Sequence, residues 1–129
     1  MNNKDNDFYE LFTELGLSVI KTEKFKWFGD YSVEACSADF CVKGVSDKSV
    51  LSFEFRNITE PDDWFIAEVV MSLVLNEQII EAPFIKQVKF IKEHISDLSA
   101  LFNVNNYYCT KARLEELVVL RGRILFQQD

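Results

Sequence analysis

Residues 31–56 have the sequence YSVEACSADFCVKGVSDKSVLSFEFR, in which apolar and polar side chains alternate in three short runs. In the last run, residues 50–56, the apolar side chains share one face and the polar side chains share the other, which is typical of a half-buried strand. Polar clusters at 37–39 and 46–48 indicate turns. Because consecutive strands joined by short turns pair antiparallel, this stretch predicts a meander. The predicted strands are residues 31–36, 40–45 and 50–56.

The strand chemistry continues upstream, where residues 17–22 alternate and are rich in β-branched side chains. Residues 25–28 lead into Gly29-Asp30, a dipeptide typical of two-residue hairpin turns. With that turn, Phe25 and Trp27 fall on the polar face of the sheet. Two interpretations stay open: the two aromatics form an exposed binding patch, or the N-terminal helix or a shift of register at a β-bulge removes them from the surface.

Helical periodicity flanks the strands on both sides. Residues 5–15 carry apolar side chains at helical spacing, and Gly16 after them is a typical helix end. Residues 84–102 have an apolar seam with steps of 4 and 3, which predicts a helix with one buried face. Residues 110–121 predict one more helix, which Gly122 ends.

Between the strands and these last helices, Thr59-Glu60-Pro61-Asp62 is a helix-start signal. The helix predicted from there to about Ile80 is apolar almost all round, which is typical of the centre of a core or of an oligomer interface. The whole chain, residues 1–129, therefore predicts a single α+β domain: an N-terminal helix, a four-strand antiparallel meander, then three helices packed on one face of the sheet. The side chains expected in the core are Phe53, Phe55, Val69, Val70, Leu73, Val74, Val88, Ile91 and Ile95.

The charge of the chain is −7 and is unevenly placed. Residues 1–83 hold 7 Lys and Arg against 16 Asp and Glu, a net of −9, whereas residues 84–129 hold 7 against 5, a net of +2. An acidic surface repels nucleic acid and anionic membranes and attracts basic partners. Solubility alone also explains such a charge, and both explanations stay open. We expect no signal peptide and no transmembrane segment, because the first residues are polar and the apolar runs are short.

Three cysteines, Cys36, Cys41 and Cys109, are an odd set without metal-ligand spacing. In a chain with no export signal we expect reduced, buried or half-buried thiols and a cytoplasmic location. Cys36 and Cys41 lie close enough in sequence to face each other across a turn, which leaves a redox role open.

No arrangement typical of an enzyme emerges from the sequence. The single histidine, His94, has no second histidine with which to hold a metal and is expected at the surface. Isolated glycines do not make a phosphate-binding loop. The closest carboxylates are Glu60, Asp62 and Asp63, with Glu68 further on, and capping of a helix explains them as readily as hydrolysis does. The sequence therefore predicts no enzyme, no cofactor and no metal site.

In its size, acidity, α+β pattern and lack of enzyme motifs, the chain resembles the bacterial immunity proteins of contact-dependent inhibition and related polymorphic-toxin systems. The resemblance implies a cytoplasmic inhibitor that binds and neutralises a toxin domain, often a basic nuclease, with no nucleic-acid or membrane partner. Acidic residues would steer association and aromatic residues would anchor the complex. The candidate contact residues are Asp7, Glu10, Glu14, Trp27, Glu34, Asp62, Asp63 and Trp64.

Two other functions remain as alternatives. The first is a small acidic secretion chaperone or adaptor that forms a homodimer through the apolar helix around residues 64–75. The second is a hydrolase that depends on scattered carboxylates. A partner that co-purifies from the native cell would separate the first two functions, since it would be either a toxin fragment or an exported protein.

Overall fold

The computed structural model describes residues 3–25 and 30–127, with side chains from residue 8 onward in these ranges. The described chain forms one five-stranded antiparallel sheet and four helices, which confirms the predicted α+β class. The strands lie in the sheet in the order in which they occur in the chain. The elements are α1 (Asn3–Glu14), β1 (Ser18–Lys24), β2 (Tyr31–Cys36), β3 (Phe40–Asp47), β4 (Val50–Asn57), β5 (Phe65–Ile66), α2 (Ala67–Leu75), α3 (Phe84–Phe102) and α4 (Tyr107–Phe126).

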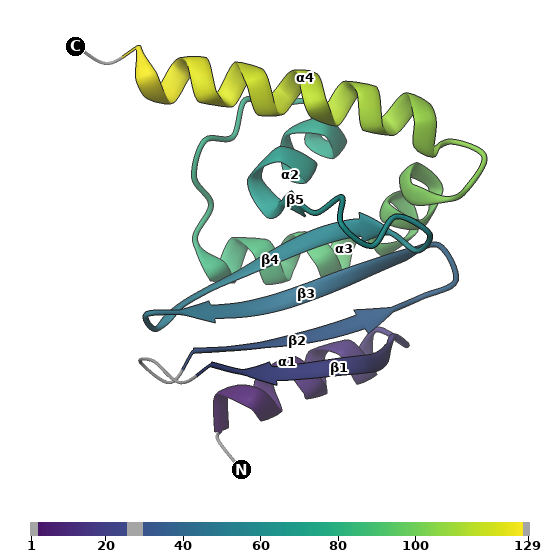
Figure 1. Cartoon of the computed structure of the whole chain (residues 1–129), viewed down its shortest axis with the longest axis vertical. Helices are drawn as coiled ribbons and strands as arrows, with labels where there is room; N and C mark the ends of the chain where they lie inside the picture. Colours follow the sequence, from purple (N-terminus) through teal and green to yellow (C-terminus); the bar gives the residue numbers. More distant parts are fainter. Residues whose placement is uncertain (1–2, 26–29, 128–129) are drawn as a thin grey trace.

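The helices lie on one face of the sheet, and α4 forms an outer layer (Figure 1). Helix α1 packs against β1 and β2, and α3 packs against β3 and β4. Helix α2 lies beside β4 and β5, and α4 packs mainly on α2 rather than on the sheet. The predicted stack of helices on one face is therefore correct in outline, with α4 one layer further from the strands. Among the described residues, no helix is both long enough and apolar enough to cross a membrane.

Phe8 of α1 shows how the helices reach the sheet. Its ring lies edge-on to Tyr31 and Phe53, with ring centroids 5.9 Å and 5.6 Å away. The ring sits directly over Gly44 of β3, where a Cβ atom would overlap it. Because Gly44 has no side chain, the Phe8 ring of α1 packs directly against the backbone of β3.

The core prediction is confirmed for five residues and holds in part for the others. Phe53, Phe55, Val69, Val70 and Ile91 are buried. The other four pack against the core while partly exposed; they are Leu73, Val74, Val88 and Ile95.

The predicted helix over 61–80 is wrong at both ends. The Thr59 backbone N–H and hydroxyl donate to Asn57 Oδ1, at 2.8 Å and 2.5 Å, so Asn57 forms a turn in place of a helix cap. Phe65 and Ile66 then pair with β4 as a short edge strand, and α2 begins only at Ala67. The helix ends at Leu75, and Asn76 has left-handed backbone angles.

The other boundaries differ less. Helix α3 has the predicted bounds, although His94 has non-helical backbone angles inside it. Helix α4 runs through Gly122 to Phe126 instead of ending there. The turn between β3 and β4 is at Lys48-Ser49, one or two residues later than predicted, and both residues have positive φ. The predicted two-residue turn at Gly29-Asp30 is wrong, because Tyr31 pairs with Lys24 and residues 25–30 join the two strands. Phe25 is exposed, as the binding-patch interpretation requires, whereas Trp27 lies outside the described residues.

Gln87 of α3 accepts a hydrogen bond from β4 at a position that the short strand β5 does not reach. The Phe53 backbone N–H of β4 donates to Gln87 Oε1 at 2.9 Å, and Gln87 Nε2 donates to the Ala82 carbonyl at 2.8 Å. Gln87 is buried, so α3 supplies a hydrogen-bond partner that a longer edge strand would otherwise provide.

Candidate functional site

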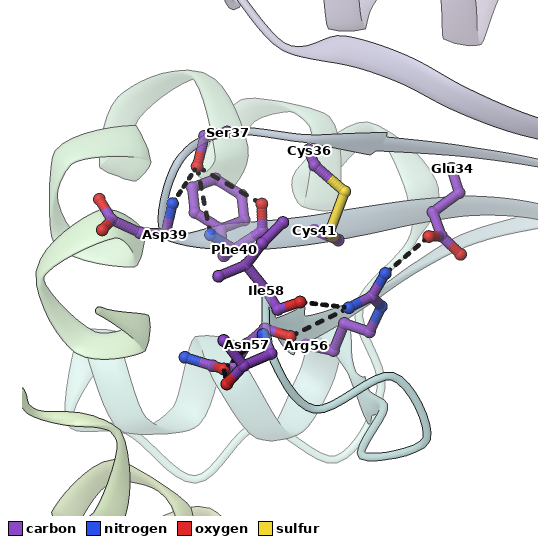
Figure 2. The surroundings of a disulfide bond; sticks show 10 residues. Glu34, Cys36, Ser37, Asp39, Phe40, Cys41, Arg56, Asn57 and Ile58 are labelled. Carbon is purple, nitrogen blue, oxygen red and sulfur yellow. Dashed lines mark hydrogen bonds and ion pairs between the residues drawn. A yellow bond between two sulfur atoms is a disulfide. The ribbon is translucent and has the colours of Figure 1, made fainter. Parts of the chain in front are cut away.

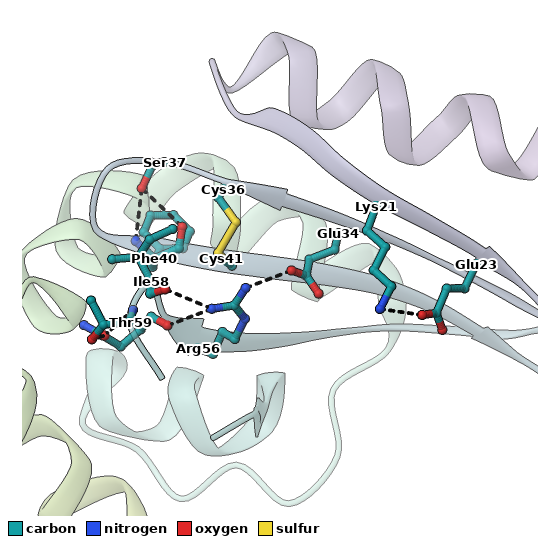
Figure 3. Close-up of polar contacts among 11 residues, drawn as sticks. Lys21, Glu23, Glu34, Cys36, Ser37, Phe40, Cys41, Arg56, Ile58 and Thr59 are labelled. Atoms are coloured by element: carbon teal, nitrogen blue, oxygen red, sulfur yellow. Dashed lines mark hydrogen bonds and ion pairs between the residues drawn. A yellow bond between two sulfur atoms is a disulfide. The ribbon is translucent and has the colours of Figure 1, made fainter. Parts of the chain in front are cut away.

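The face of the sheet opposite the described helices is polar, and it carries a row of alternating charges. The antiparallel register places Lys21 opposite Glu34, Glu34 opposite Lys43, and Lys43 opposite Glu54. We call this surface the polar sheet face. Figure 3 shows Lys21 and Glu34 on it, with the Lys21 Nζ atom 2.6 Å from Glu23. Opposite charges on facing strands stabilise a sheet, so this row fixes the register as well as the surface chemistry.

Arg56 is the buried cation of the polar sheet face. Its Nη2 atom lies 2.9 Å from Glu34, and its Nη1 atom donates to the Asn57 and Ile58 carbonyls at 3.1 Å and 3.2 Å (Figure 2). The planar guanidinium suits such a fork of acceptors. Arg56 therefore fixes the end of β4 and the start of the following loop.

Trp64 lies against this face at the end of the loop between β4 and β5. The Lys43 Nζ atom is 4.2 Å from the centre of the Trp64 ring, and the Arg56 guanidinium carbon is 5.2 Å from it. Cations at such distances are attracted by the ring face. The two cations therefore hold Trp64 in place without burying it fully.

Cys36 and Cys41 form a disulfide, so the prediction of reduced thiols is wrong for this pair. The turn between β2 and β3 places the two cysteines directly opposite each other on the polar sheet face (Figure 2). Ser37 Oγ accepts hydrogen bonds from the Asp39 and Phe40 backbone N–H groups and tightens this turn. The third thiol, Cys109, is free and exposed rather than buried.

Glu34 and the two sulfur atoms lie within 4.8 Å of one another. The sulfurs are bonded to each other and Glu34 is paired with Arg56. The group therefore does not offer the set of free ligands that a metal ion needs.

Trp64 separates two hollows of different chemistry. On one side is a cleft of about 460 Å³ in the polar sheet face, lined by charged residues that include Lys21, Glu34 and Asp62. On the other side is a hollow of about 670 Å³ between β5 and α4, which we call the apolar groove. The groove is lined mainly by Trp64, Phe65, Ile66, Glu115, Val118, Val119, Arg121, Gly122, Leu125 and Phe126.

Carboxylates from two elements gather beside Trp64. We call them the acidic cluster: Glu60, Asp62 and Asp63 from the loop, and Glu115 from α4. Lys111 lies among them, with its Nζ atom 2.7 Å from Asp63 Oδ2, and this hydrogen bond raises the pKa of the lysine. Burial first, and then the negative charges of Asp63, Glu60 and Glu115, raise the pKa of Tyr107. Asp63, Glu60 and Glu115 are thus close enough to act on the same neighbours, and Asp62 precedes Asp63 in the loop.

The structure brings together some of the predicted contact residues and separates others. Glu34, Asp62 and Trp64 line the same cleft, and Asp63 is next to it in the acidic cluster. Glu34 is less available than predicted, because Arg56 occupies it. Glu10 and Glu14 are exposed on α1, under the opposite edge of the sheet, so they belong to a different surface (Figure 1).

The other predicted residues are placed one by one. Glu14 lies 3.7 Å from Lys92, which partly balances its charge. The side chains of Asp7 and Trp27 lie outside the described residues. His94 is partly buried on α3 with its Nδ1 atom 2.8 Å from Asp97, which agrees with a structural histidine near the surface.

The sequence prediction missed Lys43, Arg56 and Glu115 as members of this surface. The first two follow from strand alternation once the register of the turns is known, because they share a face with Glu34. Glu115 had no signal in the sequence, since only tertiary packing brings α4 to the loop before β5. No family model, curated protein or solved structure matches this chain.

Proposed function

We propose that this chain is a non-enzymatic protein-binding domain of the immunity type, which binds and neutralises a basic, nuclease-type toxin domain. The observation that carries the proposal is the acidic cluster beside Trp64. Glu60, Asp63 and Glu115 act on one lysine there, with Asp62 beside them in the loop and a partly exposed tryptophan next to them. Tryptophan is enriched among binding hot spots, and charge of one sign steers a partner of the opposite charge.

The charge of the whole chain supports the same partner. The net of −9 in residues 1–83 includes the loop of the acidic cluster. A basic domain would be attracted before contact, and Trp64 would then lose water against it. We propose that neutralisation is by covering the toxin's own site and that no bond is made or broken.

The cytoplasmic location is part of this proposal. Reduced thiols no longer support this location, because Cys36 and Cys41 form a disulfide and disulfides are typical of oxidising compartments. The location therefore depends on the toxin: an inhibitor of a nuclease must meet it where nucleic acid is found.

A dimeric secretion chaperone is the second candidate, but the surface that would form the dimer differs from the one expected. The helix expected to form the dimer is α2, but Val70 at its centre is 0% exposed within the single chain. Exposed apolar residues lie instead on α4, where Val119 and Phe126 are among the most exposed. A dimer would have to use that surface. For the hydrolase, no observation favours it, because Asp63 is paired with Lys111 and Glu68 accepts a bond from the Ala82 N–H.

The test is expression of a cognate basic toxin domain in bacteria, with and without this chain. We expect growth only when both are present, and a stable complex of the two in gel filtration. An Asp62→Lys, Glu60→Lys variant should protect less well than wild type, whereas Lys86→Glu on α3 serves as the control. Recovery of an exported protein in place of a toxin would favour the chaperone, and a charge-reversed variant that protects fully would contradict the role of the acidic cluster.

A further inference from the structure

We infer that the apolar groove between β5 and α4 is the docking site for one segment of the partner, in which Lys or Arg residues lie next to bulky apolar side chains. The inference rests on the proposed function, because it names the surface through which a basic protein would be held. It goes beyond that function because the groove contains residues that charge alone would not select.

Helix α4 changes its environment along its length. In its first half Tyr107, Thr110 and Leu114 are buried against the rest of the molecule. In its second half Val118 is 46% exposed and Phe126 is 87% exposed. Figure 1 shows this yellow end of α4 in the outer layer, apart from the sheet. The second half of α4 thus has apolar side chains that the described chain leaves exposed. Such a patch marks an interaction surface more often than a chance exposure.

The groove has the size of a short peptide segment. From Glu115 to Phe126 the helix advances by about 16 Å at 1.5 Å per residue. Trp64, Phe65 and Ile66 form the facing wall. Gly122 lies on α4 between Glu115 and Phe126. No atom lies within 4 Å of the position that its Cβ would take, so the groove is open at its middle.

Charge gives the groove a direction and selects the partner. Glu115 belongs both to the acidic cluster and to the lining of the groove. One end of the groove therefore carries the Glu115 carboxylate, and the other end carries Leu125 and Phe126. Arg121 also lines the groove, but its Nε atom donates to the Ile80 carbonyl at 3.1 Å, so part of its guanidinium is already paired within the chain. A segment with cations at one end and apolar side chains at the other complements this arrangement.

The experiment is selection of a random 12-residue peptide library displayed on phage against the wild-type chain, with counter-selection on Val118→Asp. Ile85→Asp is the matched control, because Ile85 is 77% exposed on α3 and away from the groove. We expect enriched peptides with Lys or Arg beside Leu, Ile, Phe or Trp. Their affinity, measured by fluorescence polarisation, should fall at least tenfold in Val118→Asp and in Glu115→Lys but not in Ile85→Asp. Circular dichroism of each variant checks that it is folded.

Several results would overturn the inference. These are the absence of enrichment, enrichment of acidic peptides, or equal loss of affinity in Val118→Asp and Ile85→Asp. A concentration-dependent dimer in sedimentation that Val118→Asp dissociates would make a second copy the occupant, and would overturn the basic partner as well. If Val118→Asp still protects cells from a toxin that wild type neutralises, the groove is not the docking site, and the proposed function is kept. If peptides bind the groove but no basic toxin does, the proposed function is wrong, and the groove is still a docking site.

Discussion

Val70 tests the core at the scale of one residue, because it is fully buried where α2 packs on the sheet and α4. Val70→Asp would bury a carboxylate without a partner, so we expect a loss of about 5 kcal/mol in the free energy of unfolding, on the order of a small domain's stability. Val104→Asp, at an exposed position, should change it by less than about 0.5 kcal/mol. Urea denaturation followed by circular dichroism measures both values. Equal midpoints for the two variants would show that α2 is not enclosed.

The disulfide allows a second prediction at this scale. Cys36 and Cys41 are separated by five positions, so their bond closes a short loop of the unfolded chain. Changing both to Ala should lower the free energy of unfolding by about 2 kcal/mol, as expected for so short a loop. Thiol titration of the denatured, unreduced protein should find one reactive thiol, that of Cys109, and three after reduction. Three thiols before reduction would contradict the disulfide, and Cys109→Ser is the stability control.

At the scale of the elements, the strands and α3 were predictable because their patterns depend on near neighbours. The alternation in residues 50–56 and the apolar seam of 84–102 each needed only one buried face. The start of α2 was not predictable in this way. The Thr59 N–H and hydroxyl donate to Asn57 Oδ1 in a turn, and β4 offers Phe65 and Ile66 a strand partner. The first effect is a local turn that competes with the helix, and the second depends on the tertiary structure.

Gln87 provides a test of how α3 completes the sheet. Gln87→Leu keeps a side chain of similar size but leaves the buried Phe53 N–H and the Ala82 carbonyl without the partners they have now. We expect the free energy of unfolding to fall by about 2 kcal/mol, because an unpaired buried polar group keeps its desolvation cost. The exposed Gln78→Leu variant should have almost the wild-type value. A neutral Gln87→Leu would mean that water or a shift of β5 supplies the lost bonds.

Gly122 gives the opposite sign of effect. The sequence suggested that it ends a helix, whereas α4 continues through it to Phe126. A Cβ there meets no atom within 4 Å, and glycine inside a helix costs about 0.5–1 kcal/mol relative to alanine. Gly122→Ala should therefore raise the melting temperature, as measured by calorimetry. Gly44→Ala is the contrasting variant and should lower it, because its Cβ would overlap the Phe8 ring.

At the scale of the whole molecule, the sequence predicted the composition of the candidate site better than its position. Asp62, Asp63 and Trp64 were predictable because acidic and aromatic residues are adjacent there in the chain. The distance between this loop and α1 was not predictable, since it depends on which edges of the sheet the two elements occupy. The acidic first two thirds of the chain thus form at least two surfaces, one at each edge of the sheet.

Because the two acidic surfaces lie at opposite edges of the sheet, charge reversal at each of them tests which one guides the partner. If the partner is steered to the acidic cluster, Glu60→Lys with Asp62→Lys should slow association with a basic toxin domain by about tenfold at low salt. Glu10→Lys with Glu14→Lys makes the same change in net charge at the opposite edge. Its effect should be smaller at 0.1 M salt, where charges beyond a screening length of about 10 Å act weakly. Dissociation should change less than association in both variants.

Stopped-flow association rates at two salt concentrations distinguish the alternatives. All four positions are exposed, so the variants should remain folded, and Asp63 is left unchanged because Lys111 depends on it. A larger effect from the α1 pair would place the partner under β1 and β2 and away from Trp64. Equal effects from the two pairs would mean that only net charge guides the encounter, in which case the acidic cluster has no special part in binding. A loss confined to the loop pair, together with a weaker salt dependence, is the result that the geometry around Trp64 requires.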